Sequence, residues 1–432
     1  MSALHNQWKP YEKTGLRFFF IYFVIQAVPL DWKFYKALFS IDRLDVSLFS
    51  LTKYAPQFFS LEGFANWGVA ALIAAAGTVI WGLTEKKERD YDVLLYWLRV
   101  ILRYRLAIGI IAYGLIKFFP LQMPYPSLSN LHTNYGDFFA WKIYFHTIGI
   151  TQGYEIFLGA VEIIAGLLLL CRKTVTFGTG IILGFTGNVL AANFAYDVGE
   201  QVYSAYLVVI ALFLFAYDVP RLYSLLAKER YTIANKFQPV FKSPVIRLVA
   251  KSAFVLLIAL LTVSTYAGYK NDPYNIPKTP GISGTYGYYN VREFKLNNVE
   301  IPYSTTDSNR WQNVVFEKWA TLSIKIAKPL KLDLSTGDVY HAADIDRNFE
   351  SAGVGGRRYF AYKADTVLHT ILLENKNRYH QEERFRLSYQ RLGDSTIIVK
   401  GVNERNDSIY AVLDRIQKKY MLFEGRRKPI KL

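Results

Sequence analysis

The pattern of apolar and polar positions divides the chain into two contrasting parts. Up to about residue 270, long apolar runs alternate with short polar segments, and each run can cross about 30 Å of hydrocarbon as a helix. The runs predict seven membrane helices, over about 16–32, 65–84, 96–119, 151–171, 176–196, 203–219 and 248–268. From residue 275 onward, polar and apolar residues alternate as in a water-soluble domain. The predicted fold is a polytopic α-helical membrane protein followed by an all-β domain.

Short alternating runs organise the C-terminal part. They begin at Thr285 and recur about every ten residues, separated by turn residues such as Asn297-Asn298 and "LGDS". This spacing predicts a meander of antiparallel strands that closes into a barrel or a sandwich. The rhythm resembles that of a lipocalin-like barrel, which either holds a small apolar ligand or is filled and offers a rigid surface for protein contacts.

These elements predict four regions. They are an N-terminal extension of two helices with an outer amphipathic segment (1–95), a four-helix bundle (96–219), a basic loop with the last membrane helix and a linker (220–274), and the β-domain (275–432). The aromatic-rich stretches 33–64 and 120–150 are too long for simple turns, so we expect them to lie on the membrane surface or to cap the bundle. The basic stretch 221–247 suits anionic lipid headgroups. For all three stretches, a specific partner site is the alternative.

Composition and charge set the expected location. The chain is 52% apolar and 16% aromatic, and its net charge is +16. Lys and Arg concentrate on alternate flanks of the helices, which favours a cytoplasmic N-terminus; with seven helices the β-domain then lies outside. We therefore expect a bacterial inner-membrane protein with a periplasmic β-domain. The basic loops account for the charge, so membrane lipids and other protein subunits or a periplasmic client are the expected partners, not nucleic acid.

Two further features constrain this interpretation. The first apolar run, Phe18 to Leu30, follows three basic residues but precedes no small-residue cleavage pattern, so we interpret it as an uncleaved anchor. Cys171 is the only cysteine, which excludes an internal disulfide and a dithiol shuttle.

Two glutamates stand inside the predicted helix 151–171. Glu155 and Glu162 are seven residues apart and therefore share a helix face. A carboxylate near the bilayer centre costs roughly 2.5 kcal/mol or more, so each needs a partner. When the midpoints of helices 96–119 and 151–171 are aligned, Arg103 comes near the level of Glu162, and Lys117 near that of Glu155.

Asparagines on the next predicted helix extend these two pairs into a polar seam. Asn188 matches the depth of the first pair and Asn193 that of the second. The predicted seam thus consists of Arg103, Lys117, Glu155, Glu162, Asn188 and Asn193. Either it fixes the helix register through buried pairs and interhelical hydrogen bonds, or it forms a binding pocket or proton path. A cavity between these helices would favour the second alternative.

The same region resembles a known membrane family. The stretches "LRYRLAIGIIAYGLIKFF", "EIIAGLLLLCRKTVTFGTGIILGF" and "AANFAYDVGEQ" are similar to the DoxX family of four-helix membrane proteins over about 96–219. The positions that match are Arg103, Gly114, Lys117, Glu162, Gly166, Arg172, Asn193 and Phe194. Glu155 and Asn188 have no counterpart. The extra helices and the β-domain are additions to the family pattern.

The resemblance implies a four-helix fold more strongly than a function. Relatives include a quinone-reducing membrane subunit of a thiosulfate:quinone oxidoreductase, maturation factors for periplasmic redox enzymes, cargo receptors and receptor-assembly chaperones. His132 and His146 share the outer aromatic stretch and could flank a quinone headgroup. None of the six histidines has metal-ligand spacing to another ligand, so we expect no metal site. Motifs for nucleotide binding and serine hydrolysis are absent.

Three functions fit these observations. The first is a DoxX-like membrane scaffold or accessory subunit that presents the β-domain to a protein or lipid partner. The second is a quinone-interacting subunit of an oxidoreductase complex, and the third is a transporter of small molecules or lipids. The sequence assigns no catalytic residue and no cofactor, and a quinone or a lipid is the ligand it allows. Without redox cysteines or a metal-ligand set, we do not expect the isolated chain to carry out electron chemistry.

Overall fold

The computed structural model forms two compact units. It describes residues 8–41, 44–59, 63–86, 89–233, 237, 239, 244–271, 277–335 and 347–425. Residues 1–122 and 152–270 form the first unit, the helical unit. Residues 123–151 and 271–432 form the second, the barrel unit.

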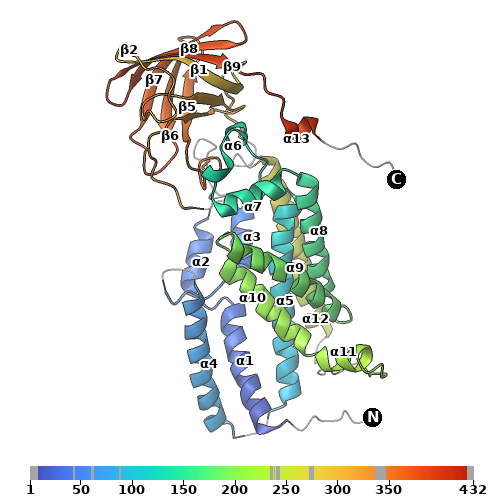
Figure 1. Ribbon diagram of the computed structural model, residues 1–432. Coiled ribbons are helices and arrows are strands. Elements are labelled where there is room, and N and C mark those ends of the chain that lie inside the picture. Colours follow the sequence, from blue (N-terminus) through green and yellow to red (C-terminus); the bar gives the residue numbers. More distant parts are fainter. Residues whose placement is uncertain are drawn as a thin grey trace. The chain divides into compact units, whose positions relative to one another are not determined.

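The helical unit contains every predicted apolar run. Seven long helices correspond to these runs: α1 (Pro10–Ala27), α4 (Phe64–Thr84), α5 (Tyr91–Phe118), α8 (Gln152–Leu168), α9 (Val175–Ala195), α10 (Gln201–Ala216) and α12 (Pro244–Asn271). Shorter helices are α2 (Trp32–Phe39), α3 (Leu44–Thr52) and α11 (Val219–Leu226). Helix α5 packs against α1, α8 and α10, and Figure 1 shows it among the long helices of this unit.

Fewer helices than predicted satisfy the length and composition of a membrane span. Among the described residues there are four such helices, or six if each of two bent helix pairs counts as one span. Helix α5 is outside this set because it carries Asp92, Arg99, Arg103, Arg105 and Lys117. The structure thus shows four to six apolar helices where the sequence predicts seven spans.

Glycines determine how closely α5 approaches α8. A Cβ atom added to Gly114 would lie 2.8 Å from Ile163 Cγ1 and 2.9 Å from the carbonyl oxygen of Gly159. Gly166 likewise faces Ile111, where an added Cβ would lie 2.5 Å from Cγ1. Only small residues allow two helix backbones to come this close. These contacts align Gly114 with Gly159 and Ile163, which sets the register of the two helices.

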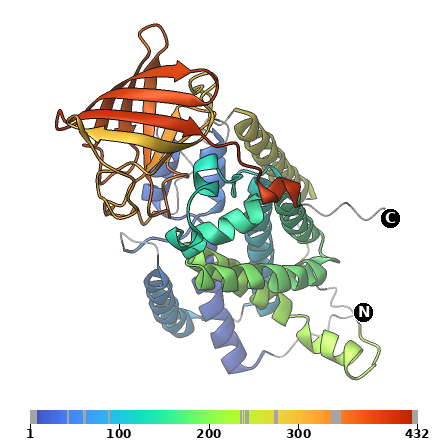
Figure 2. The ribbon, with the colours of Figure 1, turned by 45° about the horizontal axis from the view of Figure 1, so that its top comes forward.

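The barrel unit contains eight strands that close on themselves. They are β1 (Gly287–Leu296), β3 (Asn313–Phe316), β4 (Thr321–Lys325), β5 (Arg358–Asp365), β6 (Thr370–Asn375), β7 (Arg384–Leu392), β8 (Thr396–Asn403) and β9 (Ser408–Arg415). The short strand β2 (Val299–Glu300) forms a hairpin with the end of β1. Each strand pairs antiparallel with the next, and β9 pairs with β1 from Tyr289↔Arg415 to Leu296↔Ile409. The predicted meander is confirmed, and it is a closed barrel, visible in Figure 2.

Large apolar side chains fill the centre of the barrel. Alternate strand positions point inward, and Phe294, Phe316, Phe360, Leu373 and Leu413 are at most 2% exposed. A barrel of about eight strands is just wide enough for side chains to fill. Of the two alternatives stated for a lipocalin-like barrel, the structure shows the filled one.

The segment between α5 and α8 belongs to the barrel unit. Residues 123–151 contain α6 (Leu128–Leu131), the 3-10 helix η1 (Tyr135–Asp137) and α7 (Ala140–Gly149). We call them the docking segment. The sequence placed this stretch with the helical bundle as an outer connector, whereas the structure packs it against the β-domain, where Figure 1 shows α6 beside the barrel. The chain therefore passes between the two units three times, at 122–123, 151–152 and 270–271.

Candidate functional site

A buried ion pair joins α5 to α8. Lys117 Nζ lies 2.7 Å from each carboxylate oxygen of Glu162. Lys117 is 5% exposed and Glu162 is 4% exposed. The predicted pairs, Arg103 with Glu162 and Lys117 with Glu155, are therefore wrong.

The helix register explains this correction. Midpoint alignment placed Ile108 of α5 opposite Val161 of α8, but the glycine contacts place Gly114 there instead. Helical side chains lean toward the N-terminus of their helix, so Lys117 reaches back by about one turn to the level of Glu162. Arg103 lies about four turns from Lys117, toward the other end of α5.

The remaining seam residues do not join this pair in one cluster. Glu155 is fully buried in α8. Asn188 is exposed on α9, so its predicted place in the seam is wrong. Asn193 is buried, but its Nδ2 donates to Ser204 Oγ at 2.9 Å and to the Glu200 carbonyl at 3.3 Å. Asn193 therefore holds the turn between α9 and α10, and the continuous six-residue seam is not formed.

Arg105 has a structural role that the sequence did not reveal. Its guanidinium is buried and donates to the carbonyl oxygens of Thr52 and Tyr54, the latter at 2.7 Å. Tyr203 Oη donates to the Thr52 carbonyl as well, at 2.7 Å. These bonds attach the end of α3 to α5 and α10.

The two histidines proposed to flank a quinone have different surroundings in the barrel unit. The His132 ring stacks on Tyr288 with ring centroids 3.7 Å apart, and its Nε2 lies 2.7 Å from Tyr420 Oη. Burial, with Lys418 and Arg357 nearby, lowers the pKa of His132 to about 4, so this ring is neutral at pH 7. The His146 ring packs edge-on against Phe138 and Phe349. These contacts have no residue in common, and the geometry gives no support to a quinone clamp made by the two rings.

Glu317 is the centre of the contact between the docking segment and the barrel. One of its carboxylate oxygens accepts from the backbone N–H of Ser129 at 2.7 Å and from the Ser129 hydroxyl at 2.6 Å. The other accepts from the N–H of Leu128 at 3.3 Å. Glu317 is 2% exposed, and burial raises its pKa against the opposing effect of the Ser129 hydrogen bonds. The carboxylate thus satisfies backbone donors that the start of α6 cannot satisfy by itself.

Neighbouring polar groups complete this contact. The Ser129 hydroxyl accepts from Ser323 Oγ on β4 at 2.8 Å, and both residues are fully buried. Asn130 Nδ2 donates to Tyr359 Oη on β5 and to the Glu350 carbonyl, each at 3.1 Å. The outer face of β4 and β5 is therefore a second buried surface, covered by α6.

Helix α7 is attached to the same unit through residues 347–356. The Lys142 side chain is fully buried and donates to the Phe349 carbonyl. The N–H of Phe139 donates to the Gly353 carbonyl at 2.9 Å. Gly353 has a φ of +66°, and a Cβ there would lie 2.5 Å from the Trp141 ring, so both backbone conformation and space require glycine.

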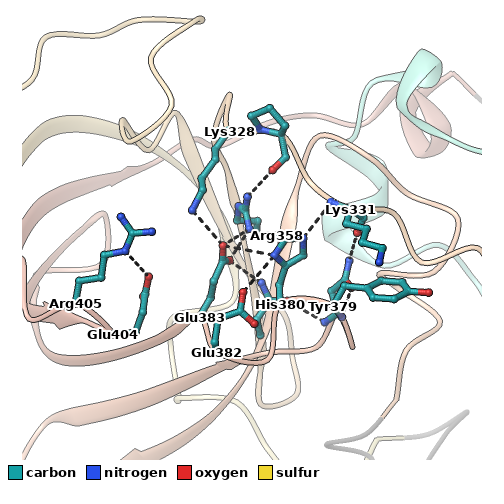
Figure 3. A network of polar contacts seen from close by, with 12 residues as sticks. Lys328, Lys331, Arg358, Tyr379, His380, Glu382, Glu383, Glu404 and Arg405 are labelled. Atoms are coloured by element: carbon teal, nitrogen blue, oxygen red, sulfur yellow. Dashed lines mark hydrogen bonds and ion pairs between the residues drawn. The ribbon is translucent and has the colours of Figure 1, made fainter.

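A cavity of about 530 Å³ lies beside the barrel. It is lined by residues 325–330 and 356–358 and by Asp137, among others. Arg358, the first residue of β5, lines this cavity but is not available to a ligand. Figure 3 shows that Arg358 and Lys328 both point at Glu383. Arg358 Nη1 lies 2.5 Å from both Glu383 carboxylate oxygens, and Lys328 Nζ lies 3.5 Å from one of them.

The same network orients His380. The backbone N–H of Lys331 donates to His380 Nε2 at 3.0 Å, so this ring nitrogen acts as an acceptor (Figure 3). Asn375 Nδ2 donates to Glu383 at 2.9 Å. Hydrogen bonds of this network connect residues 329–331 with residues 375–383. Within the described parts of the chain, no group of three or more His, Cys, Asp or Glu side chains could hold a metal ion.

Comparisons with known proteins add a partial relative. No family model matches the chain, and no solved structure matches it. An uncharacterized protein of Bacillus subtilis (strain 168), YwoB, is 34% identical over 79 residues, which is 18% of this chain and 49% of that protein. The chain thus spans about half the length of the curated relative that it matches. Because this relative is uncharacterized, the match suggests no function for the chain.

Proposed function

We propose that the protein is an integral membrane scaffold of the DoxX type. Its apolar helices cross the inner membrane, and its β-barrel stands on the periplasmic side as a rigid surface for a protein or lipid partner. Four to six apolar helices of suitable length support the membrane location. The excess of Lys and Arg on the predicted cytoplasmic flanks supports the orientation, which counts α5 as a seventh span.

The observation that carries this proposal is the docking segment. A barrel joined by one linker would move freely, whereas this barrel binds a segment whose two ends continue into α5 and α8. The contact is buried and fully hydrogen-bonded at Glu317, and buried polar contacts of this kind are costly to break. Three chain connections between the units, rather than one, suit a scaffold better than a tethered soluble domain.

The barrel interior supports the same function. It is filled by side chains, so recognition by the barrel would use its outer surface. The buried Lys117–Glu162 pair acts in this account as the bond that fixes the α5–α8 register next to the docking segment in the chain.

Cysteine labelling in intact cells tests the proposed location. Cys171, exposed at the end of α8, is on the predicted cytoplasmic side. Ser395, exposed between β7 and β8, is on the predicted outer side. In spheroplasts, a membrane-impermeant maleimide should label Ser395→Cys in a Cys171→Ser background, and should label the native Cys171 only after permeabilisation. The protein should also stay in the membrane pellet at alkaline pH.

Two results would contradict the proposal. Extraction of the chain by alkaline carbonate would exclude an integral membrane location. Equal labelling of both positions before permeabilisation, with the cells shown to be intact, would exclude the proposed orientation.

A further inference from the structure

A small cavity in the helical unit gathers three arginines from three parts of the fold. Its volume is about 50 Å³. Arg99 and Arg103 are on α5, one turn apart, and Arg172 follows α8. Asp92 near the start of α5, Tyr217 at the end of α10 and Phe237 also line it.

The two α5 arginines that line the cavity, Arg99 and Arg103, have unused hydrogen-bond donors. The Nε atoms of both Arg99 and Arg103 are buried and have no hydrogen-bond partner among the described residues. The Arg99 guanidinium lies 3.5 Å from the centroid of the Tyr217 ring. The ring covers one face of the guanidinium, whose N–H groups lie in its plane and so do not point at the ring. Buried donors without acceptors are rare in native proteins and cost free energy. Beside a cavity, such donors are placed to bind an acceptor.

Two carboxylates of the described residues lie near these cations. Asp218 Oδ2 is 3.9 Å from Arg99, and it accepts a hydrogen bond from Thr176 Oγ1 at 2.7 Å. Asp92 Oδ1 accepts from Trp8 Nε1 at 3.2 Å. Accepting these hydrogen bonds leaves the charge of each carboxylate unchanged. The described charged groups at the cavity are thus three arginines and two carboxylates, so their net charge is positive.

We propose that this cavity binds the phosphate group of an anionic membrane lipid. About 50 Å³ has room for roughly four water-sized groups, which suits a tetrahedral phosphate. The planar guanidinium fork matches phosphate oxygens better than any other side chain.

The position in the fold favours a lipid over a free anion. Asp92 is next to the start of α5, Val175 is the first residue of α9, and Tyr217 follows the last residue of α10, so the cavity opens where helices end. Headgroups lie at that level, and basic pockets between helices on the cytoplasmic side suit them. Leu95, Val100 and Leu214 line the rest of the cavity and suit the start of an acyl chain. The lipid source rests on the proposed membrane location, whereas the excess of arginine does not.

A lipid titration of the full chain tests this site. The purified protein in a neutral detergent is titrated with phosphatidylglycerol, phosphatidylcholine and inorganic phosphate, and native mass spectrometry measures binding. We expect saturable binding of phosphatidylglycerol that is at least about tenfold tighter than that of phosphatidylcholine. The double variant Arg99→Gln/Arg103→Gln should weaken phosphatidylglycerol binding by about tenfold or more. Arg99→Lys/Arg103→Lys, which keeps the charge, should retain part of it.

A matched control separates this site from general attraction by charge. Lys173→Gln/Arg221→Gln removes the same charge from exposed positions that do not line the cavity, and it should change binding by less than about twofold. Unchanged phosphatidylglycerol binding by a folded Arg99→Gln/Arg103→Gln protein, shown by its thermal unfolding, would overturn the proposal. So would saturation by inorganic phosphate without phosphatidylglycerol binding. Both results are independent of the labelling experiment, so failure of the site and failure of the membrane location can be told apart.

Discussion

Replacing Lys117 with Met should destabilise the helical unit by about 3–5 kcal/mol, because it leaves Glu162 buried without its partner. Both atoms of the carboxylate contact Lys117 Nζ at 2.7 Å, so a single substitution removes both interactions. Reversible unfolding of the purified protein in mixed micelles, followed by circular dichroism, measures the change in free energy.

Two control variants distinguish this pair from ordinary charge removal. Lys117→Met/Glu162→Leu removes both charges and should recover most of the lost free energy, since apolar replacements of a buried pair are often neutral. Lys53 also contacts a glutamate, Glu200, at 2.8 Å, but these side chains are 28% and 34% exposed. Lys53→Met should therefore cost only about 0–1 kcal/mol. If Lys117→Met costs no more than Lys53→Met, the buried pair does not stabilise the α5–α8 contact.

Replacing Glu317 with Leu should detach the docking segment from the barrel. The substitution leaves the N–H groups of Leu128 and Ser129 buried without an acceptor, at about 1–3 kcal/mol for each. A loss of about 3 kcal/mol corresponds to roughly a hundredfold weaker association.

Cutting the chain between the units makes this loss visible. A site for a specific protease is inserted after Asn271, and the protein is cleaved in isolated membranes. The barrel of the parent should stay in the membrane pellet, because the docking segment still holds it, whereas the barrel of Glu317→Leu should appear in the supernatant. Glu382→Leu is the control: its side chain is 68% exposed, and it should behave as the parent. Release of the parent barrel on cleavage would show that the docking contact does not hold the domain.

Local patterns were enough to predict the elements. Apolar runs predicted the helices because a membrane-length helix needs many consecutive apolar residues, and alternation predicted the strands because successive side chains point to opposite faces. The spacing of the runs predicted a barrel or a sandwich. The choice between them depended on the pairing of β1 with β9, strands separated by more than a hundred residues.

The helix register could not be obtained from apolar runs alone. The midpoint of a run estimates depth to within a few residues, and the correct alignment depended on where small residues let backbones approach. Gly114, Gly159 and Gly166 carried that information, and aligning them would have paired Lys117 with Glu162. Asn188 was assigned by depth alone, without regard to its helix face, and the structure leaves it exposed.

The docking contact had no local signal. Ser129 and Glu317 are 188 residues apart, and α6 is only four residues long, too short for a helical pattern. The sequence of β4 alternates polar and apolar residues as a half-exposed strand does, yet Thr321, Leu322, Ser323 and Ile324 are all buried. The burial of its polar face becomes apparent only once the covering segment is known.

Disulfide trapping of the docking segment tests the central claim most directly. Ser129 Oγ and Ser323 Oγ are 2.8 Å apart, so Ser129→Cys/Ser323→Cys, in a Cys171→Ser background, places two sulfur atoms within bonding reach. After mild oxidation and cleavage at the inserted site, we expect the helical and barrel fragments to remain joined on a denaturing gel and to separate with reductant. Fragments that separate without reductant, as expected for the control Ser129→Cys/Ser388→Cys with its exposed position on β7, would contradict a barrel held by the segment between α5 and α8.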